Sequence, residues 1–349
     1  MVVENWIPMD GDTFVTSDGF IMNTFGYEHP EEHVFAFLKY IPAKYKDMFN
    51  VEMLERTWRY NQTELFRAEK LYTAKNYQVF IEAFRKNFPN YLVYDKNRDK
   101  EIISAPLDRI QEVFVPRDRL VWLQNLAQRD ELQNKALDLI NLISKEANIP
   151  ISDMGLHGSL ALNMHAPHSD IDFVVYGTDN FRLVEKAIEK LVSEAKLNYI
   201  VGNRLDAARK FQGRYQGKIY MYNATRQFNE NITTAKFGQY KYTPLTPVQF
   251  QATISSDRET MYRPATYKIS NYKPLNIESE LPFDKIPIQI VSNIGCYRNI
   301  AKQGNEIKVA GKLEKVETTT PTDDRKVFYQ VVVGTATSEE EYIWPITIQ

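Results

Sequence analysis

Two carboxylates, Asp170 and Asp172, follow a Gly158-Ser159 pair after an intervening stretch of ten residues, Leu160 to Ser169. The apolar run from Ile171 predicts a strand that carries both carboxylates, and residues two apart on a strand point to the same face. Two like charges this close repel each other unless cations neutralise them, and hard oxygen ligands suit Mg²⁺ or Mn²⁺. The pattern therefore indicates a divalent-metal site that can clamp a triphosphate and activate an attacking hydroxyl.

The Gly158-Ser159 pair is the second part of this predicted site. A glycine at a turn lets the backbone approach a phosphate closely, and the amide hydrogens and the Ser159 hydroxyl can donate to it. A helix beginning at Leu160 would add its positive end. The alternative is a plain turn followed by solvated carboxylates, which explains poorly why an apolar strand would begin with two inward-facing charges.

A basic segment, residues 203–218, has five basic residues and one acidic residue, with Phe211 and Tyr215 between them. Arg209, Lys210 and Arg214 are predicted to bind phosphate or an acceptor backbone. The aromatic side chains could stack on bases. The alternative interpretation is a solvated basic loop.

The elements around the site are predicted from apolar spacing. Residues 129–148 have apolar positions at intervals of three and four, which predicts an amphipathic helix that Pro150 ends. A short strand at 153–157 follows, then the strand of Asp172, and then a second amphipathic helix capped by Thr178. The predicted order is helix, strand, strand, helix, strand.

The first segment, residues 1–118, is predicted to be an α/β domain. Thr13 to Met22 indicates a hairpin around Asp18-Gly19, and His33 to Ile41 indicates a strand. Residues 53–88 are predicted to be helical with interruptions.

The last segment, residues 246–349, alternates polar and apolar residues at 248–254, 306–313 and 327–333, which predicts a β-rich barrel or sandwich. Residues 317–325 are predicted to form a loop. We therefore expect an α+β fold, with a nucleotidyltransferase-like core of mixed sheet and helices at 119–245 and a flanking domain on either side.

Composition excludes several classes of protein. The single cysteine, Cys296, rules out an internal disulfide and a multi-thiolate zinc site, and is predicted to be a small core residue. The formal net charge of −2 gives no global signal for nucleic-acid binding. No apolar run is long enough for a membrane span and no secretory signal is evident, so a cytoplasmic protein is expected.

Taken together, the Gly-Ser pair, the gap and the Asp-x-Asp on a strand resemble the DNA polymerase β-like nucleotidyltransferase superfamily. The resemblance implies that Asp170 and Asp172 hold Mg²⁺ or Mn²⁺ and that Gly158 and Ser159 hold the triphosphate of an NTP. The implied reaction transfers a nucleoside monophosphate to an acceptor hydroxyl. The flanking segments favour a large acceptor such as RNA. No membrane partner is expected.

A wider part of the chain resembles an archaeal family of predicted nucleotidyltransferases with extra domains on both sides. The matching segments are Asp18 to Phe20, Gly26 to Pro30, Leu38 to Pro42, Tyr262 to Ile269 and Val309 to Glu314.

One departure concerns the third carboxylate that the superfamily usually places on a later strand. The strand expected there, 217–226, has no acidic residue. Asn223 is a candidate for that position, and Asp206 or Glu230 are candidates to reach it from flanking segments. The alternatives to an active enzyme are a nucleotide- or RNA-binding protein that has lost turnover, or a scaffold whose β domain docks another protein.

Overall fold

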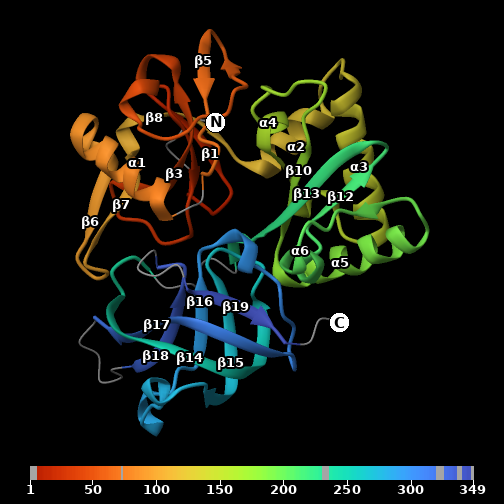
Figure 1. The fold of residues 1–349 in the computed structure, drawn as a ribbon. Coiled ribbons are helices and arrows are strands. Elements are labelled where there is room, and N and C mark those ends of the chain that lie inside the picture. Colours follow the sequence, from red (N-terminus) through yellow and green to blue (C-terminus); the bar gives the residue numbers. More distant parts are fainter. Residues whose placement is uncertain (1–5, 72–73, 230–235, 320–325, 336–339, 347–349) are drawn as a thin grey trace.

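The computed structural model describes residues 6–71, 74–229, 236–319, 326–335 and 340–346, which form three sheets with helices packed on the first two (Figure 1). This mixture of sheets and helices agrees with the predicted α+β class. The predicted loop at 317–325 lies largely outside the described residues. Within the described residues, no helix is both long and apolar enough to cross a membrane.

The N-terminal sheet has the strand order β4-β5-β3-β2-β1-β8, and β7 joins it through β3 and pairs with β6. The predicted hairpin is confirmed, since β1 pairs with β2. The ring of Phe20 lies at the centre of an aromatic cluster with Phe49, Phe84 and Tyr91. The elements are β1 Thr13–Thr16, β2 Ile21–Thr24, β3 His33–Pro42, β4 Trp58–Tyr60, β5 Thr63–Phe66, α1 Ala74–Asn87, β6 Leu92–Asp95, β7 Lys100–Pro106 and β8 Ile110–Phe114.

The helical prediction for residues 53–88 was correct only in its second half. Strands β4 and β5 occupy 58–66, where Trp58, Tyr60 and Thr63 have the side chains that strands favour, and the helix α1 starts at Ala74. The imperfect helical period across this segment reflects the change from strand to helix.

The central sheet has the order β11-β12-β13-β10-β9, with β10 and β13 parallel. Helices α3 and α5 cover one face, because their apolar stripes bury against Phe173 and Tyr222 of the sheet. The N-terminus of α3 has a capping box built from Asp130 and Gln133. The elements are α2 Pro116–Gln124, α3 Glu131–Ala147, β9 Met154–His157, α4 Gly158–Ala161, β10 Ile171–Tyr176, α5 Thr178–Ser193, β11 Asn198–Tyr199, α6 Arg204–Arg209, β12 Gln212–Tyr215 and β13 Lys218–Thr225.

The strands of the C-terminal sheet follow the order β14-β15-β16-β18-β17, and β17 pairs again with β14. The sheet therefore closes into a barrel. The predicted β-rich fold is thus found, in its barrel form. The predicted domain boundary at residue 245 falls inside β14. The strands are β14 Tyr240–Glu259, β15 Ala265–Pro274, β16 Gln289–Ser292, β17 Glu306–Thr318, β18 Val327–Val333 and β19 Tyr342–Pro345.

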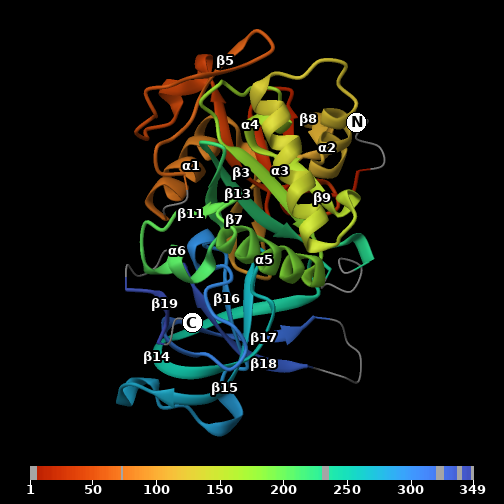
Figure 2. The ribbon, with the colours of Figure 1, turned by 90° about the vertical axis from the view of Figure 1, so that its right-hand side faces the viewer.

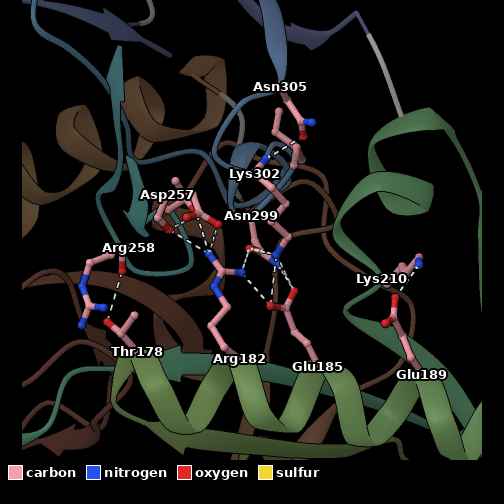
Figure 3. A network of polar contacts seen from close by, with 12 residues as sticks. Thr178, Arg182, Glu185, Glu189, Lys210, Asp257, Arg258, Asn299, Lys302 and Asn305 are labelled. Carbon is pink, nitrogen blue, oxygen red and sulfur yellow. Dashed lines mark hydrogen bonds and ion pairs between the residues drawn. The ribbon is translucent and has the colours of Figure 1, made fainter. Parts of the chain in front are cut away.

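Helix α5 joins the central sheet to the barrel, and Figure 2 shows it lying along the top of the barrel strands. Arg182 on α5 donates to Asp257 Oδ2 at 2.8 Å, to Glu185 Oε2 at 2.6 Å and to Asn299 Oδ1 at 2.6 Å (Figure 3). Lys302 Nζ completes the network with a contact of 2.7 Å to Glu185 Oε1. These mutually paired charges fix the barrel against the face of α5 that points away from the central sheet.

Thr178 begins α5, but the N-cap position belongs to Gly177. The Thr178 hydroxyl donates to the carbonyl oxygen of Arg258 at 3.1 Å. Thr178 therefore does not cap α5 as predicted. Its hydroxyl group links the helix to the barrel.

Candidate active site

The turn at Gly158 and the carboxylate of Asp172 are built together. Strand β9 ends at His157, which pairs with Asp172 on the antiparallel neighbour β10. The chain then turns at Gly158 with φ +68°, a conformation that side chains other than glycine rarely adopt. A Cβ on residue 158 would lie 2.1 Å from Asp172 Oδ2, so only glycine fits here. The carboxylate thus packs directly on the predicted phosphate-binding turn, next to the buried Ser159.

The two predicted metal-binding carboxylates differ in environment. Asp172 is on β10, whereas Asp170 is exposed and precedes the strand, so the prediction that one strand carries both was wrong for Asp170. The loop from Ala166 to Ser169 turns back on itself, since Ser169 N donates to Ala166 O at 2.9 Å. Burial, together with the charge of Asp170, raises the pKa of Asp172 well above its usual range. A carboxylate this costly to ionise calls for cations beside it.

The positive charges of Lys39 and Arg67, which belong to the N-terminal domain, favour the ionised form of Asp172 in the central sheet. Strand β3 has an irregularity where Ile21 pairs with Tyr40 and Met22 with Leu38, which leaves Lys39 as the extra residue of a β-bulge. Lys39 is 7% exposed. Burial lowers its pKa to about 8, although the negative charges of Asp172 and Asp170 favour its protonated form.

His157 is surrounded by cations from the other two sheets. Burial, followed by the charge of Lys39 and by the smaller effects of Arg263 and Arg298, lowers the pKa of His157 to about 3, although a backbone hydrogen bond with Gly11 raises it. The imidazole is therefore neutral, and its Nε2 is buried without a hydrogen-bond partner in the described part of the protein. Arg263 follows β14, and Arg298 follows the short helical turn Gly295–Tyr297 of the barrel segment. Groups from all three sheets thus meet at the edge where β9 ends.

Of the three candidates, neither of the two that the structure describes supplies a third carboxylate at this edge. Register places Asn223 of β13 beside Val174, on the face of the sheet that Asp172 occupies. The Asn223 Oδ1 accepts from Arg298 Nη2 at 2.7 Å. Asp206 forms an ion pair with Arg209 at 2.7 Å. Glu230 lies outside the described residues.

The predicted phosphate-binding cations have protein partners or lie in solvent. Arg209 donates to Asp206 and also to the Gly295 carbonyl oxygen, at 3.2 Å. Lys210 contacts Glu189 of α5 at 2.9 Å, as drawn in Figure 3. Arg214 is exposed on β12. A role for these three in phosphate binding stays a prediction.

Other side chains near the motif, and the single cysteine, are placed as follows. His165 Nε2 contacts Asp130 Oδ2 at 2.7 Å, and His168 is exposed. Cys296 is half-buried instead of in a core. Tyr220 and Tyr222 pack in the core of the central sheet.

The donor set at Asp172 fits a metal ion that arrives with a nucleotide. Across the described segments, no group of three or more His, Cys, Asp or Glu side chains is arranged to hold a metal by itself. Mg²⁺ commonly binds through one or two carboxylates and takes its other ligands from substrate phosphates and water. Asp172 and Asp170 meet that requirement, and the turn of Gly158 lies where the phosphates would sit.

Comparison with known proteins agrees with this geometry. Residues 138–222 match the family described as nucleotidyltransferase domain, a span from helix α3 to strand β13 that contains Gly158, Ser159, Asp170 and Asp172. The protein therefore contains a nucleotidyltransferase domain of the DNA polymerase β-like kind, as its motif predicted. It is also similar to an uncharacterized protein of the archaeon Methanocaldococcus jannaschii, with 26% identity over 356 residues that cover 95% of this chain and 97% of that protein. No solved structure matches the chain.

Sequence analysis did not identify Lys39, Arg67, Arg263 or Arg298 as neighbours of the site. For Lys39 a signal existed, since it is the one charged residue within the apolar stretch Val34 to Ile41. Lysine is rarely buried in a strand. Here the carboxylate that favours the charged form of Lys39 belongs to a different sheet.

Proposed function

We propose that this protein is a metal-dependent nucleotidyltransferase that transfers a nucleoside monophosphate from an NTP to an acceptor hydroxyl. The observation that carries the proposal is the direct packing of the Asp172 carboxylate on the Gly158 turn, inside the segment that matches the nucleotidyltransferase family. This packing brings a metal ligand and a phosphate-binding turn to one point, as the reaction requires.

In the proposed reaction the amide groups of the Gly158 turn and the Ser159 hydroxyl hold the triphosphate. Asp170 and Asp172 hold Mg²⁺ or Mn²⁺, which would supply charge neutralisation and activation of the acceptor hydroxyl. A bond forms between the acceptor oxygen and the α-phosphorus while the bond from that phosphorus to pyrophosphate breaks. The hydroxyl proton passes to water, and pyrophosphate leaves with the bonding electron pair.

The acceptor is proposed to be a large molecule such as RNA. The basic segment 203–218 supports this proposal through the exposed Arg214, whereas Arg209 and Lys210 would have to exchange their present carboxylate partners for phosphate. Transfer to a small metabolite instead of RNA would contradict this part of the proposal.

The test uses α-labelled NTPs with Mg²⁺ or Mn²⁺, total RNA as the acceptor, and the full-length protein. Wild type is expected to transfer label, and Asp172→Asn is expected to lose transfer by at least about 1000-fold, since a ligand of the reacting centre is removed. Asp179→Asn is the matched control, because Asp179 is 82% exposed on α5. Equal transfer by wild type and Asp172→Asn would refute the proposal.

A second candidate function is nucleotide binding without turnover, favoured by the lack of an acidic residue on strand β13. Mg²⁺-dependent NTP binding with no transfer to RNA, to the protein or to small hydroxyl compounds would support it. Transfer that depends on Asp172 would exclude it.

A further inference from the structure

We infer that this site binds a triphosphate with one divalent cation instead of two, and that the Lys39 ammonium supplies the positive charge that a second cation would give. The inference rests on the proposed function and specifies how the same site holds its substrate. Nucleotidyl transfer with two metals uses a pair of cations about 4 Å apart that flank the reacting phosphorus. The ligands that the described residues offer fit only one of them.

The first argument is the absence of ligands for a second cation among the described residues of β13. Those nearest to Asp172 on its face of the sheet are Met221, its direct neighbour in register, and Asn223. Met221 offers a thioether, which is a poor ligand for Mg²⁺. Asn223 already accepts a hydrogen bond from Arg298, which is 8% exposed. A buried guanidinium at this position repels a metal ion, so β13 presents positive charge where a third carboxylate would present negative charge.

The second argument is the state of Lys39. In the parts of the chain that the structure describes, its ammonium has neither an ion-pair nor a hydrogen-bond partner, and it lies 5.7 Å from the centre of the Tyr40 ring. The Lys39 side chain is 7% exposed, so its charge is only partly solvated, which costs free energy. Tyr40, the residue after Lys39, packs with Leu162 and Met164 of the segment that follows the Gly158 turn, which brings strand β3 to this turn. The charges of Lys39 and Asp172 favour each other's ionised form. An anionic ligand would repay the cost of burying Lys39.

The third argument is that further donors around the same point are also unused. Arg67 and Arg263 each have a buried Nε with no hydrogen-bond partner among the described residues. Arg67 acts on Asp172 and Arg263 acts on His157 through their charges. Arg263 Nη1 lies 3.6 Å from Asp10 Oδ1, and the Nε of Arg263 takes no part in this ion pair. Cations of the N-terminal domain and of the barrel segment thus lie near the site of the central sheet. A polyanion such as a triphosphate could bind to cations of both.

The chemistry follows from the position of Lys39. As the bond from the α-phosphorus to the leaving oxygen breaks, negative charge develops on pyrophosphate. The Lys39 ammonium keeps its proton and neutralises that charge, so no further reactant is needed. Asp170 and Asp172 would hold the single metal ion, which would neutralise charge on the same phosphates.

The test counts metal ions with Mn²⁺ and inorganic tripolyphosphate, a probe that carries no base and undergoes no nucleotidyl transfer. Electron paramagnetic resonance of the full-length protein is expected to show an isolated Mn²⁺ that requires tripolyphosphate for binding. An exchange-coupled pair of ions would overturn the inference and leave the proposed function intact. If the protein binds neither Mn²⁺ nor tripolyphosphate, both fail.

The role of Lys39 is tested by calorimetric titration of the same probe into variants. Lys39→Met is expected to weaken tripolyphosphate binding by roughly 10-fold to 100-fold, the effect of losing one charge-assisted hydrogen bond. Lys44→Met is the matched control, because Lys44 is exposed just after β3, and it should bind as wild type does. Lys39→Arg keeps the charge and should recover most of the loss, which excludes misfolding as the cause. Wild-type affinity in Lys39→Met would overturn the assignment.

Discussion

The carboxylate of Asp172 lies against the backbone of Gly158, so closely that a Cβ at residue 158 would fall 2.1 Å from Oδ2. One short turn therefore serves two purposes. In the proposed reaction it exposes amide groups to phosphate, and it leaves room for the carboxylate of Asp172 to stand beside them. A change in either residue disturbs both parts of the site.

Replacement of Gly158 by alanine tests this dependence. Gly158→Ala is expected to displace the Asp172 side chain and abolish binding of Mn²⁺-tripolyphosphate, since the added methyl group meets the carboxylate. It should also cost about 1 kcal/mol of stability, because φ is +68°. Binding is measured by calorimetry and stability by urea unfolding.

The matched control for Gly158→Ala is Gly217→Ala in the turn between β12 and β13. Gly217 has φ +79°, and a Cβ added there would meet nothing within 4 Å, so the substitution carries the backbone strain without the clash. It should lose similar stability and keep full binding. Equal loss of binding in both variants would show that backbone strain, and not contact with Asp172, is the cause.

The sequence predicts local features of the site and misses its long-range ones. Gly158, Ser159 and Asp172 were found because β9, the turn and β10 are adjacent in the chain, and their spacing is set by local geometry. Lys39 and Arg298 come from positions more than 100 residues away from Asp172 in sequence, and no periodic pattern reports which strand will face which.

The predicted phosphate-binding role of Arg209 and Lys210 stays a prediction, because both residues have a nearby partner of opposite charge. Arg209 and Lys210 are basic residues beside the site in sequence, yet Asp206 lies three residues before Arg209 on the same helix, and Glu189 lies opposite Lys210 on α5. Composition shows that a segment is basic. It does not show whether a carboxylate has already engaged those charges.

The environment of Asp172 leads to a prediction about stability. Burial raises its pKa, so above neutral pH its ionised form opposes folding, with only partial compensation from Lys39 and Arg67. Asp172→Asn is therefore expected to unfold at pH 8 at a temperature equal to or above that of wild type, although transfer is lost. Calorimetric melting of both proteins without metal checks this.

A neighbour on the same strand provides the comparison for Asp172→Asn. Phe173 is fully buried against Tyr222, and Phe173→Ala should cost about 3 to 5 kcal/mol. If Asp172→Asn were as destabilising as Phe173→Ala, Asp172 would be a structural residue, and its assignment to the reaction would lose support.

The network on α5 leads to a prediction about how the barrel is held. Arg182→Met leaves Asp257 and Glu185 without their shared partner, and the loss of one member of such a partly buried cluster should cost about 3 kcal/mol. Burial opposes ionisation of Glu185, whereas Lys302 and Arg182 hold its pKa below the usual range, and in the variant Lys302 remains as its partner. Urea unfolding and limited proteolysis of the barrel report the effect.

The same interface contains an exposed ion pair that serves as the control for Arg182→Met. Arg258 and Asp179 lie 3.4 Å apart with 67% and 82% of their side chains exposed. Arg258→Met should change stability by less than about 0.5 kcal/mol. A comparable loss in both variants would mean that the loss of charge itself, and not the partly buried network, sets the stability of the interface.

Asp12 leads to a prediction about pH. It is 3% exposed and accepts from Trp6 Nε1 at 2.8 Å and from Met9 N at 3.0 Å. Burial, only partly offset by these hydrogen bonds and increased by the charges of Asp10 and Asp118, raises the pKa of Asp12 from 3.8 to about 7. The folded state therefore holds a proton that the unfolded state releases between these two values.

The sign of the pH effect follows from that proton. The contribution of Asp12 to stability is fully present below about pH 4 and is lost as pH rises to about 7, by at most about 4 kcal/mol. Asp12→Asn keeps the acceptor oxygen and removes the titration. Relative to wild type, its free energy of unfolding should therefore rise as pH increases across this window, measured by urea unfolding at several pH values. The exposed Asp138→Asn should keep a constant difference from wild type. A difference between Asp12→Asn and wild type that does not change with pH would show that Asp12 is ionised in the folded protein throughout this range.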